Sequence, residues 1–437
     1  MKFLRKSKLL DNVIYIREQA TTHMEQTMMT TNKKTEKKCI STQIFSRILT
    51  SGIIVCSLTH ISFAQGRDEP AVNFEKKLEL VIFNPLESER TNEPIAIPVT
   101  VISEKAPDFN RYFFRLKHKT NWYEPLDIPS QIMITTTVNG NVEELMFNVN
   151  LAPLEKKVVE LWYNPQGTGL PDYPVKTQSF EKWYTGGTNV AWENELIAYR
   201  SYNGLVDYFA KTYLHLRLHD LVPDSYHHER LWGIDPFVIG SKPGLCGVIL
   251  FKGENQIKCY GSSENLPLSY IHKAYEGGPV CTGIMVSVNM NDERVLEETY
   301  TLFNGRYENI VTTVISKNYR GDNVLVAPGM QKFDSADVLV NEQKGFMAFQ
   351  GSPVEEYGTI GMALIWNPEN ARGVFETEDG HFIKLKPTSN GTVKYLSLAV
   401  WYRGSTLQPV SDEPFISMVE KIALGFANPV RIEIIEH

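Results

Sequence analysis

The stretch from Ile132 to Val149 reads IMITTTVNGNVEELMFNV. It holds two runs rich in β-branched and apolar residues, separated by the dipeptide Asn139-Gly140. Both central residues of a tight hairpin turn adopt positive φ, which Asn and Gly tolerate better than other residues. The stretch therefore predicts a β-hairpin, and with it an antiparallel sheet.

The same kind of pattern continues on both sides of this hairpin. Runs rich in β-branched and aromatic residues, bounded by Asn, Pro and Gly, predict further strands. They lie at residues 77–83, 95–102, 111–117, 158–163, 280–290, 298–303, 310–315, 346–350, 360–366 and 394–401. Only residues 413–426 have the apolar spacing of a helix, with Asp412 as its cap. The expected fold is mostly β, a large antiparallel β-sandwich with one C-terminal helix.

The length and composition bear on domain organisation. A chain of 437 residues with 42% hydrophobic residues can bury one large core or two smaller ones. We expect an N-terminal β region over residues 65–171 and the main sandwich over residues 172–437. One continuous domain over residues 72–437 is the alternative.

The charge of the chain limits its partners. The formal net charge is −7, and the first 64 residues are basic, so the remainder is more acidic than this value. An acidic protein is a poor partner for nucleic acid or an anionic membrane surface. A local group of Arg and Lys can still hold an anionic sugar, so an acidic oligosaccharide or polysaccharide stays compatible.

The first 64 residues have the features of an export signal. A basic region precedes an apolar run of eleven residues at 48–58, and Ser62-Phe63-Ala64 offers small residues for cleavage before Gln65. The run is shorter than the roughly 20 residues of a membrane span, so no integral membrane association is expected. We expect a signal peptide behind an overlong N-terminal extension, and a periplasmic or extracellular protein. Lipid anchoring at Cys56 is the minor interpretation, because Val55 stands where a small residue is usual.

Three cysteines follow the predicted cleavage site: Cys246, Cys259 and Cys281. In an exported protein they predict one disulfide and one thiol, with Cys246 and Cys259 on adjacent strands as the favoured pair. No Cys-x-x-Cys pair occurs and no His is near any of the three, so neither a zinc site nor a Cys nucleophile has support. No metal or other cofactor is expected.

The densest group of functional side chains lies between Trp192 and Gly240. Within it, leucines at 214, 216 and 218 alternate with His215, Arg217 and His219. A period of two predicts a strand over residues 213–219, with the leucines on one face and the polar side chains on the other. An ordinary solvated sheet face would give the same pattern, so the polar face is either a site or plain surface.

Four groups of residues, in this order, resemble one known family. They are Ile128–Gln131, Glu143–Phe147, Trp192–Glu195 with Tyr199-Arg200, and Trp232–Asp235 with Val238–Gly240. The combination resembles an exported bacterial family catalogued as a domain of unknown function, frequent in loci that degrade pectin and other uronate polysaccharides. The resemblance implies a β-supersandwich of the galactose-mutarotase type, a fold that hosts polysaccharide lyases, epimerases and glycosidase-associated domains. Family members often carry an Asp-rich turn like a calcium loop where this chain has none, so no calcium site is expected.

This setting points to chemistry on uronates, for which the central residues offer two routes. β-Elimination needs a cation or amide at the sugar carboxylate, a base for the α-proton and an acid for the leaving oxygen. The candidates are Asn194, Arg200 and Arg217 for the first role, and Tyr208, Lys211, His227 and His228 for the others. Hydrolysis instead needs two carboxyl groups about 5–9 Å apart. Its candidates are Glu193, Glu195, Glu229 and Asp235, and the sequence does not choose between the routes.

Trp192, Trp232 and His215 are further candidates for contact with a sugar, but structural interpretations compete. Trp is mostly buried on average, so both tryptophans are more often core anchors than sugar platforms. Glu193 and Asp235 can also serve as simple ion-pair partners of nearby arginines. A glycan-binding or accessory protein without turnover is therefore the competing function.

The placement of the site is a separate expectation. If the cluster is a sugar site, we expect one groove on the concave face of the sandwich to bring three kinds of side chain together. These are Arg200 or Arg217, His227 or His228, and Trp192 or Trp232.

Overall fold

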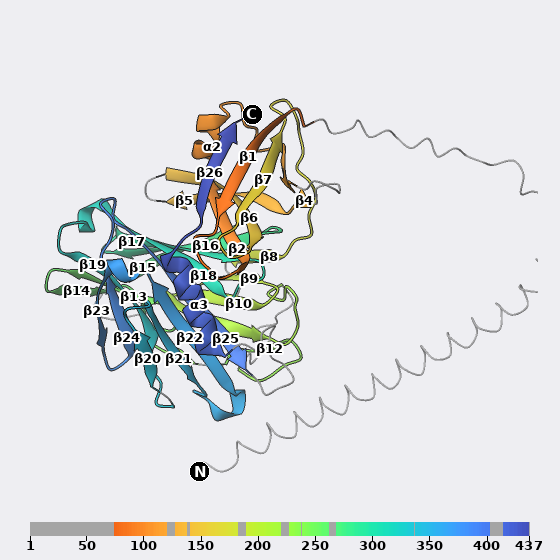
Figure 1. Cartoon of the computed structure of the whole chain (residues 1–437). Coiled ribbons are helices and arrows are strands. Elements are labelled where there is room, and N and C mark those ends of the chain that lie inside the picture. The colour runs from red at the N-terminus through yellow and green to blue at the C-terminus, as the bar shows by residue number, and fades with distance from the viewer. Residues whose placement is uncertain are drawn as a thin grey trace, which may run out of the picture. The chain divides into compact units, whose positions relative to one another are not determined.

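The computed structural model describes residues 74–119, 127–137, 140–181, 189–219, 227–236, 238–261, 268–335, 337–402 and 414–436. Asn73–His437 forms one compact unit. Its described part is mostly β, with several antiparallel sheets and two α-helices, which confirms the expected fold class (Figure 1). Within these ranges no helix is long and apolar enough to cross a membrane. The predicted export signal lies outside the described residues.

Two small sheets contain the predicted hairpin. One has the strand order β26-β1-β7-β3-β4 and the other β2-β6-β5. Their strands are β1 (Lys76–Phe83), β2 (Arg90–Pro98), β3 (Phe114–His118), β4 (Asp127–Ile128), β5 (Ser130–Thr137), β6 (Gly140–Leu151), β7 (Lys156–Tyr163) and β26 (Arg431–Glu436). Alternate residues of β1, such as Leu78 and Leu80, share one core with Leu145 and Phe147 of β6. In Figure 1, β26 in blue lies beside β1 in orange, far from it in sequence.

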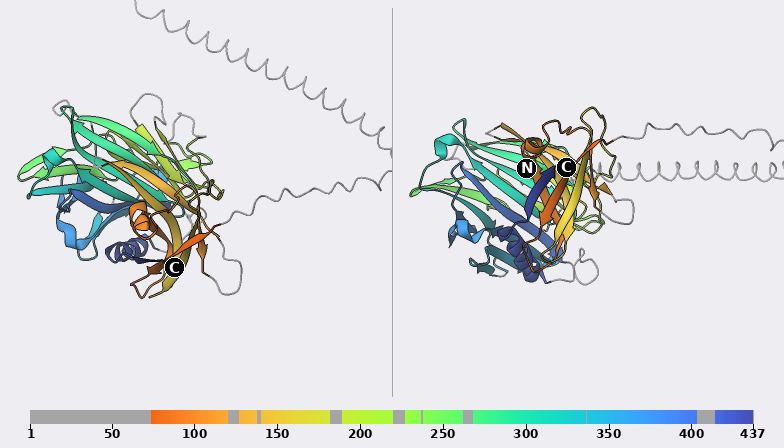
Figure 2. Two further views of the ribbon diagram at one scale, coloured as in Figure 1. Left: turned by 90° about the horizontal axis from the view of Figure 1, so that it is seen from above. Right: turned by 45° about the horizontal axis from the view of Figure 1, so that its top comes forward.

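Three larger sheets hold most of the remaining chain. Their orders are β12-β11-β10-β9-β8, β14-β13-β19-β24-β23 and β15-β16-β17-β18-β25-β22-β21-β20. The first contains β8 (Thr177–Glu181), β9 (Asn189–Asn194), β10 (Ile197–Tyr202), β11 (Leu205–Lys211) and β12 (Gly233–Ile234). The second contains β13 (Gly247–Lys252), β14 (Asn255–Lys258), β19 (Val324–Gln331), β23 (Ala371–Glu376) and β24 (Gly380–Leu385). One continuous apolar core draws residues from all three sheets. Figure 2 shows the sheets from two further directions.

The third of these sheets has eight strands. They are β15 (Leu268–Tyr275), β16 (Cys281–Met290), β17 (Glu293–Phe303), β18 (Glu308–Ile315), β20 (Val338–Asn341), β21 (Phe346–Gly351), β22 (Thr359–Trp366) and β25 (Thr392–Tyr402). Single 3₁₀ turns lie at Lys317–Tyr319, Glu355–Tyr357 and Pro368–Asn370. Helix α3 (Phe415–Ala427) packs on this sheet through Phe415, Val419 and Ala423. The predicted helix is thus confirmed, while its expected cap Asp412 lies outside the described residues.

The hairpin prediction is also confirmed. Strands β5 and β6 pair antiparallel, with Thr137 opposite Gly140. Gly140 has φ 115°, a conformation that glycine adopts without strain. Asn139 lies outside the described residues.

The strand expected over residues 95–102 is only partly correct. β2 ends at Pro98, and helix α2 (Val99–Lys105) follows at once. Proline has no N–H for a sheet ladder, and its fixed φ suits the start of a helix, which explains the change at this residue. The β-branched residues after Pro98 therefore lie on a short helix that the sequence does not predict.

The strand expected over residues 213–219 is wrong. The segment is a series of bends in which Leu214 is exposed and only Leu218 is fully buried. Two of its backbone N–H groups do not take part in a strand ladder. Those of Arg217 and Leu218 both donate to the Glu193 carboxylate, each at 2.7 Å. A tertiary partner thus overrides the local alternation.

The predicted disulfide is also absent. Among the described residues Cys246, Cys259 and Cys281 are free, buried thiols. In the β13–β14 hairpin the N–H of Cys259 donates to the carbonyl of Val248 at 2.9 Å. The register therefore places Cys259 opposite Val248 rather than opposite Cys246, so the expected cross-strand pairing does not form.

Candidate functional site

Alternation along β9, β10 and β11 divides the candidate residues between the two faces of one sheet. Trp192 and Tyr208 belong to the main core on one face. Arg200 and Asp207 are directly opposite each other on neighbouring strands and lie on the other face, as does Glu193. Successive residues of a strand point to opposite sides, so residues adjacent in sequence such as Trp192 and Glu193 do not meet in one groove.

The core-facing candidates are structural in this fold. The Trp192 Nε1 donates to Asn309 Oδ1 at 2.7 Å, and the Tyr208 hydroxyl donates to a backbone carbonyl of β25 at 3.2 Å. The side-chain amide of Asn194 donates to the carbonyls of Phe303 and Arg306. Trp192, Asn194 and Tyr208 are each 0% exposed. These three therefore do not contact a ligand from solvent, contrary to the roles considered for them from sequence.

On the opposite face, Glu193 and Lys211 form a buried ion pair. The Lys211 ammonium also donates to the carbonyls of Asn194 at 2.6 Å and His215 at 2.8 Å. Burial lowers the pKa of Lys211 from its usual value, while the Glu193 carboxylate opposes this shift. Because Glu193 also accepts the N–H groups of Arg217 and Leu218, the pair fastens the bent segment to the sheet.

A second polar network joins Arg200, Asp207, Asp235 and His227. The Arg200 guanidinium bonds to both carboxylate oxygens of Asp207 and lies 3.7 Å from Asp235 Oδ2. The Nδ1 of His227 lies 3.7 Å from the same Asp235 oxygen and 3.3 Å from its backbone carbonyl. Burial raises the pKa of Asp207, and Arg200 opposes the rise. Asp235 is 0% exposed, whereas the His227 side chain is 33% exposed, so the buried carboxylate lies beside a ring that reaches the surface.

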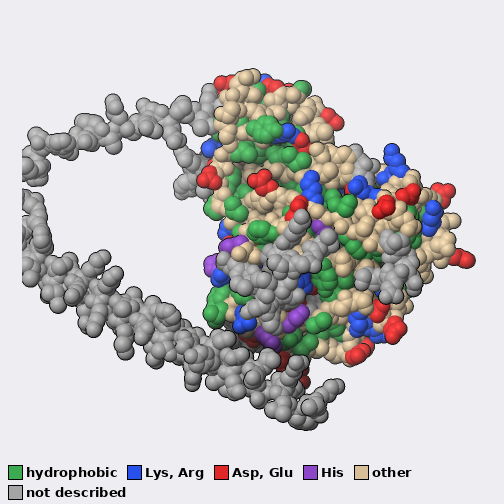
Figure 3. Space-filling model, turned by 180° about the vertical axis from the view of Figure 1, so that it is seen from behind, with side chains coloured by type: hydrophobic (Ala, Val, Ile, Leu, Met, Phe, Trp, Pro, Cys, Tyr) green, Lys and Arg blue, Asp and Glu red, His purple; other side chains and the backbone are tan. Residues whose placement is uncertain are grey.

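Three further histidines of the central stretch are exposed. His215, His219 and His228 are exposed, and Figure 3 shows histidine side chains gathered on one face of the molecule. The Trp232 ring is half-buried and packs edge-on against Phe209, with 6.0 Å between ring centres. The structure thus brings Arg200, His227 and Asp235 into one network, and Glu193, Lys211 and Arg217 into another.

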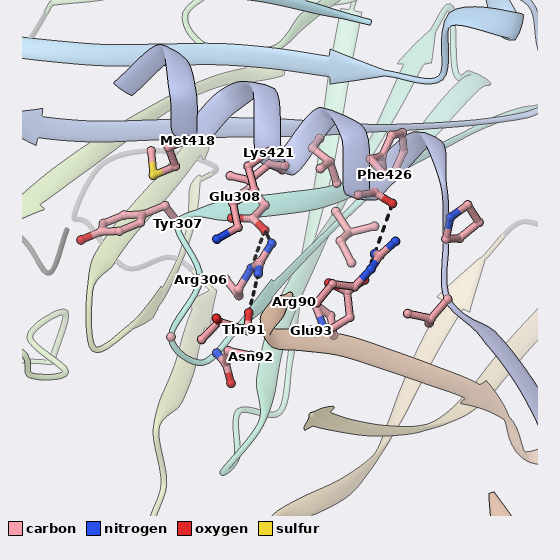
Figure 4. Close-up of a pocket in the computed structure, with 18 of the residues that line it drawn as sticks. Arg90, Thr91, Asn92, Glu93, Arg306, Tyr307, Glu308, Met418, Lys421 and Phe426 are labelled. Carbon is pink, nitrogen blue, oxygen red and sulfur yellow. Dashed lines mark hydrogen bonds and ion pairs between the residues drawn. The ribbon is translucent and has the colours of Figure 1, made fainter. Parts of the chain in front are cut away.

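A separate cavity of about 570 Å³ lies beneath helix α3 (Figure 4). Five parts of the chain line it: residues 86–94, Leu196 between β9 and β10, residues 305–310 at the start of β18, strand β25, and helix α3 with the residues after it. Arg90 pairs with Glu93, and Arg306 pairs with Glu308. Burial raises the pKa of Glu93, while Arg90 and Arg306 oppose the rise. No residue of the Glu193–Lys211 network or of the Arg200–Asp207–Asp235–His227 network lines this cavity.

Sequence reasoning missed the cavity. Its charged residues lie in four distant places, at the start of β2, at the start of β18, on β25 and on α3. The only local signal is the spacing of Arg90 and Glu93, three residues apart, which is common on protein surfaces. Nothing in the sequence alone indicates that these stretches meet.

Two solved structures resemble this fold at low similarity. One is a protein in the glycosyl hydrolase family 38 from Enterococcus faecalis, with a TM-score of 0.45 and 10% sequence identity over 82% of this chain. The other is an alpha-mannosidase from Enterococcus faecalis V583, with a TM-score of 0.46 and 11% identity over 84% of this chain. The chain spans about half the length of these proteins, 47% in each case.

No curated protein matches the chain. A family model does match it over residues 82–432, which is most of the described part and includes both networks and the cavity. The expectation of a family catalogued as a domain of unknown function is thereby confirmed. The chain belongs to the family described as Domain of unknown function (DUF4861).

Proposed function

We propose that the protein is an exported carbohydrate-active enzyme that acts on acidic, uronate-containing oligosaccharides of the pectin type by β-elimination. The reaction would take place at the surface around His227. The base removes the proton next to the sugar carboxylate, the bond to the leaving oxygen breaks, a carbon–carbon double bond forms, and an acid protonates the leaving oxygen. The observation that carries the proposal is the contact between His227 and Asp235.

This contact suits a general base. The buried Asp235 carboxylate and carbonyl both face Nδ1 of His227, which favours a proton on that nitrogen. Nε2, on the opposite edge of the ring, then carries the lone pair that accepts a proton. The neighbouring His228 is exposed and is the candidate acid. Arg217, half-buried on the same face of the sheet, is the candidate partner for a uronate carboxylate.

Of the four carboxyl candidates for hydrolysis, Glu229 is exposed and Glu195 is half-buried, whereas Glu193 and Asp235 are buried. A hydrolase needs two carboxyl groups that both reach the sugar. Glu193 and Asp235 are each 0% exposed, and Glu193 is held by Lys211 and two backbone N–H groups. Neither is placed to attack or protonate a glycosidic bond from solvent.

A glycan-binding protein without turnover is the second candidate function. The half-buried Trp232 ring beside exposed histidines would offer an apolar surface and polar groups to a sugar without any reaction. Binding would depend on Trp232, whereas elimination would also depend on His227.

The test uses the purified protein and a panel of pectic and other uronate oligosaccharides. Wild type is expected to generate the ultraviolet absorbance of an unsaturated uronide, and His227→Ala to lower kcat/KM about 100-fold or more. His118→Ala is the matched control, because His118 lies on β3 in another sheet and should leave activity unchanged. Binding without product would favour the second candidate, and neither binding nor product across the panel would contradict both.

Export is part of the same proposal. It rests on the basic region, the apolar run and the small residues before Gln65. N-terminal sequencing of protein secreted by a bacterial host should begin at Gln65. An uncleaved protein retained in the cytoplasm would contradict export.

A further inference from the structure

The cavity beneath α3 has the size of a ligand site. Its volume of about 570 Å³ falls within the roughly 300–1,000 Å³ typical of pockets that enclose small molecules. It is bounded by elements of different sheets and by one helix, so its walls are fixed by the fold rather than by a single loop.

The surface of the cavity is mostly apolar. Leu196, Ile310 and Leu396 line it from the strand side, and Met418 and Ile422 line it from the helix. Sugars are usually held by flat aromatic surfaces with many hydrogen-bonding groups. Tyr307 and Phe426 also line this cavity, but most of its apolar side chains are narrow and branched or flexible, which suits an alkyl chain.

The charges of the cavity leave a positive excess. Two of the four basic side chains, Arg90 and Arg306, are already paired with Glu93 and Glu308, and both arginines also donate to backbone carbonyls. Lys394 and Lys421 are exposed, and within the described ranges neither forms a salt bridge. Among the lining residues one further acid, the exposed Glu89, stands against these two lysines, and Glu144 outside the lining interacts electrostatically with Lys394.

Figure 4 shows how the apolar part and the charged part of the cavity lie relative to each other. Lys421 extends from α3 on the same side as Arg306 and Glu308, while Phe426 lies farther along the helix. An apolar chamber with a cationic entrance matches a molecule with an apolar tail and a negative head.

We propose that this cavity binds a single-chain amphiphile with an anionic head group, its tail among the aliphatic side chains and its head beside Lys394 and Lys421. The shared chemistry is a long alkyl chain that ends in a carboxylate or a phosphate. The proposal is independent of the sugar chemistry proposed above, because the two sites share no residue.

Calorimetric titration with dodecanoate, below its micelle concentration, tests the proposal. Dodecanoate is expected to bind at one site, and dodecyltrimethylammonium, with the same chain and a positive head, to bind at least tenfold more weakly. Dodecyl phosphate distinguishes the source of the head group, since the tighter of the two anions identifies it. Equal binding of the cationic compound, or no binding of either anion, would overturn the proposal.

Variants locate the site. The double substitution Lys394→Gln with Lys421→Gln should weaken dodecanoate binding about tenfold. Ile422→Trp should abolish it by filling the cavity, with circular dichroism showing that the fold is kept. Lys344→Gln is the matched control, because Lys344 is an exposed lysine that pairs with Glu420 outside the cavity. Unchanged binding in Ile422→Trp, or displacement of dodecanoate by uronate oligosaccharides, would assign the ligand elsewhere.

Discussion

Glu298 is a carboxyl group in the middle of the main core. It lies on β17, is 1% exposed, and accepts a hydrogen bond from the Tyr395 hydroxyl at 2.9 Å. Burial raises its pKa to about 7, against opposing hydrogen bonds from Tyr395, Tyr300 and Thr313. The group therefore gives up its proton less readily in the folded protein than in the unfolded chain.

This shift predicts how stability changes with pH. The stabilising contribution is fully present below the unfolded pKa of about 4.5 and is lost as pH rises through the folded value of about 7. Between pH 5 and pH 8 the free energy of unfolding should fall by up to about 3 kcal/mol, at about 1.4 kcal/mol per pH unit of separation. Urea unfolding at several pH values should show this slope in wild type and a flatter one in Glu298→Gln.

The control for this measurement is Glu355→Gln, at an exposed glutamate in a 3₁₀ turn. It should keep the slope of wild type. An identical slope in wild type and Glu298→Gln would contradict the assignment of the proton to Glu298.

At the scale of elements, substitutions in β26 would measure how much this edge strand contributes to the free energy of unfolding. Ile434 packs partly against the core shared by the two small sheets, while its neighbour Ile435 is 36% exposed on the other side. Ile434→Asp should lower the free energy of unfolding by about 2 kcal/mol, because it places a charge against an apolar surface. Ile435→Asp should change it by less than about 0.5 kcal/mol, as is usual for surface substitutions. Equal effects in thermal unfolding would show that β26 does not pack as described.

Strands with strong local signals are the elements that the sequence predicts well. β1, β7 and β22 are rich in β-branched, aromatic and other apolar residues, and the β5–β6 hairpin has its turn dipeptide. Residues 213–219 have the same alternation, yet no strand forms there because Glu193 takes two of their N–H groups. The pattern of residues within a segment does not indicate which distant side chain will accept its N–H groups.

The candidate site shows the same limit. The sequence identifies the stretch that carries His227 and Asp235, and the structure places them in contact. It does not separate Trp192 from Glu193, because the strand that sends them to opposite faces has polar residues on both faces and is buried on both. The cavity residues come from five distant parts of the chain, so no local pattern predicts them.

At the scale of the whole molecule, the buried cysteines report on global unfolding. Cys246, Cys259 and Cys281 are each at most 1% exposed, and burial raises the pKa of each thiol. A full-length protein with Cys39→Ser and Cys56→Ser should show no thiol reactive toward an aromatic disulfide reagent while folded, because the reactive thiolate is suppressed. It should show three after unfolding without reductant. A single thiol after unfolding would instead support the disulfide between Cys246 and Cys259.

The pairing of β26 with β1 has a consequence for the order of events during synthesis. β1 is the first described strand to leave the ribosome and β26 the last, yet Leu78 and Glu436 are partners in one ladder. The backbone N–H and C=O groups on one edge of β1 therefore lack their β26 partners until every other described strand has been synthesised. The five-stranded sheet closes late, and closing so long a loop makes this step slow relative to the pairing of local hairpins such as β5 and β6.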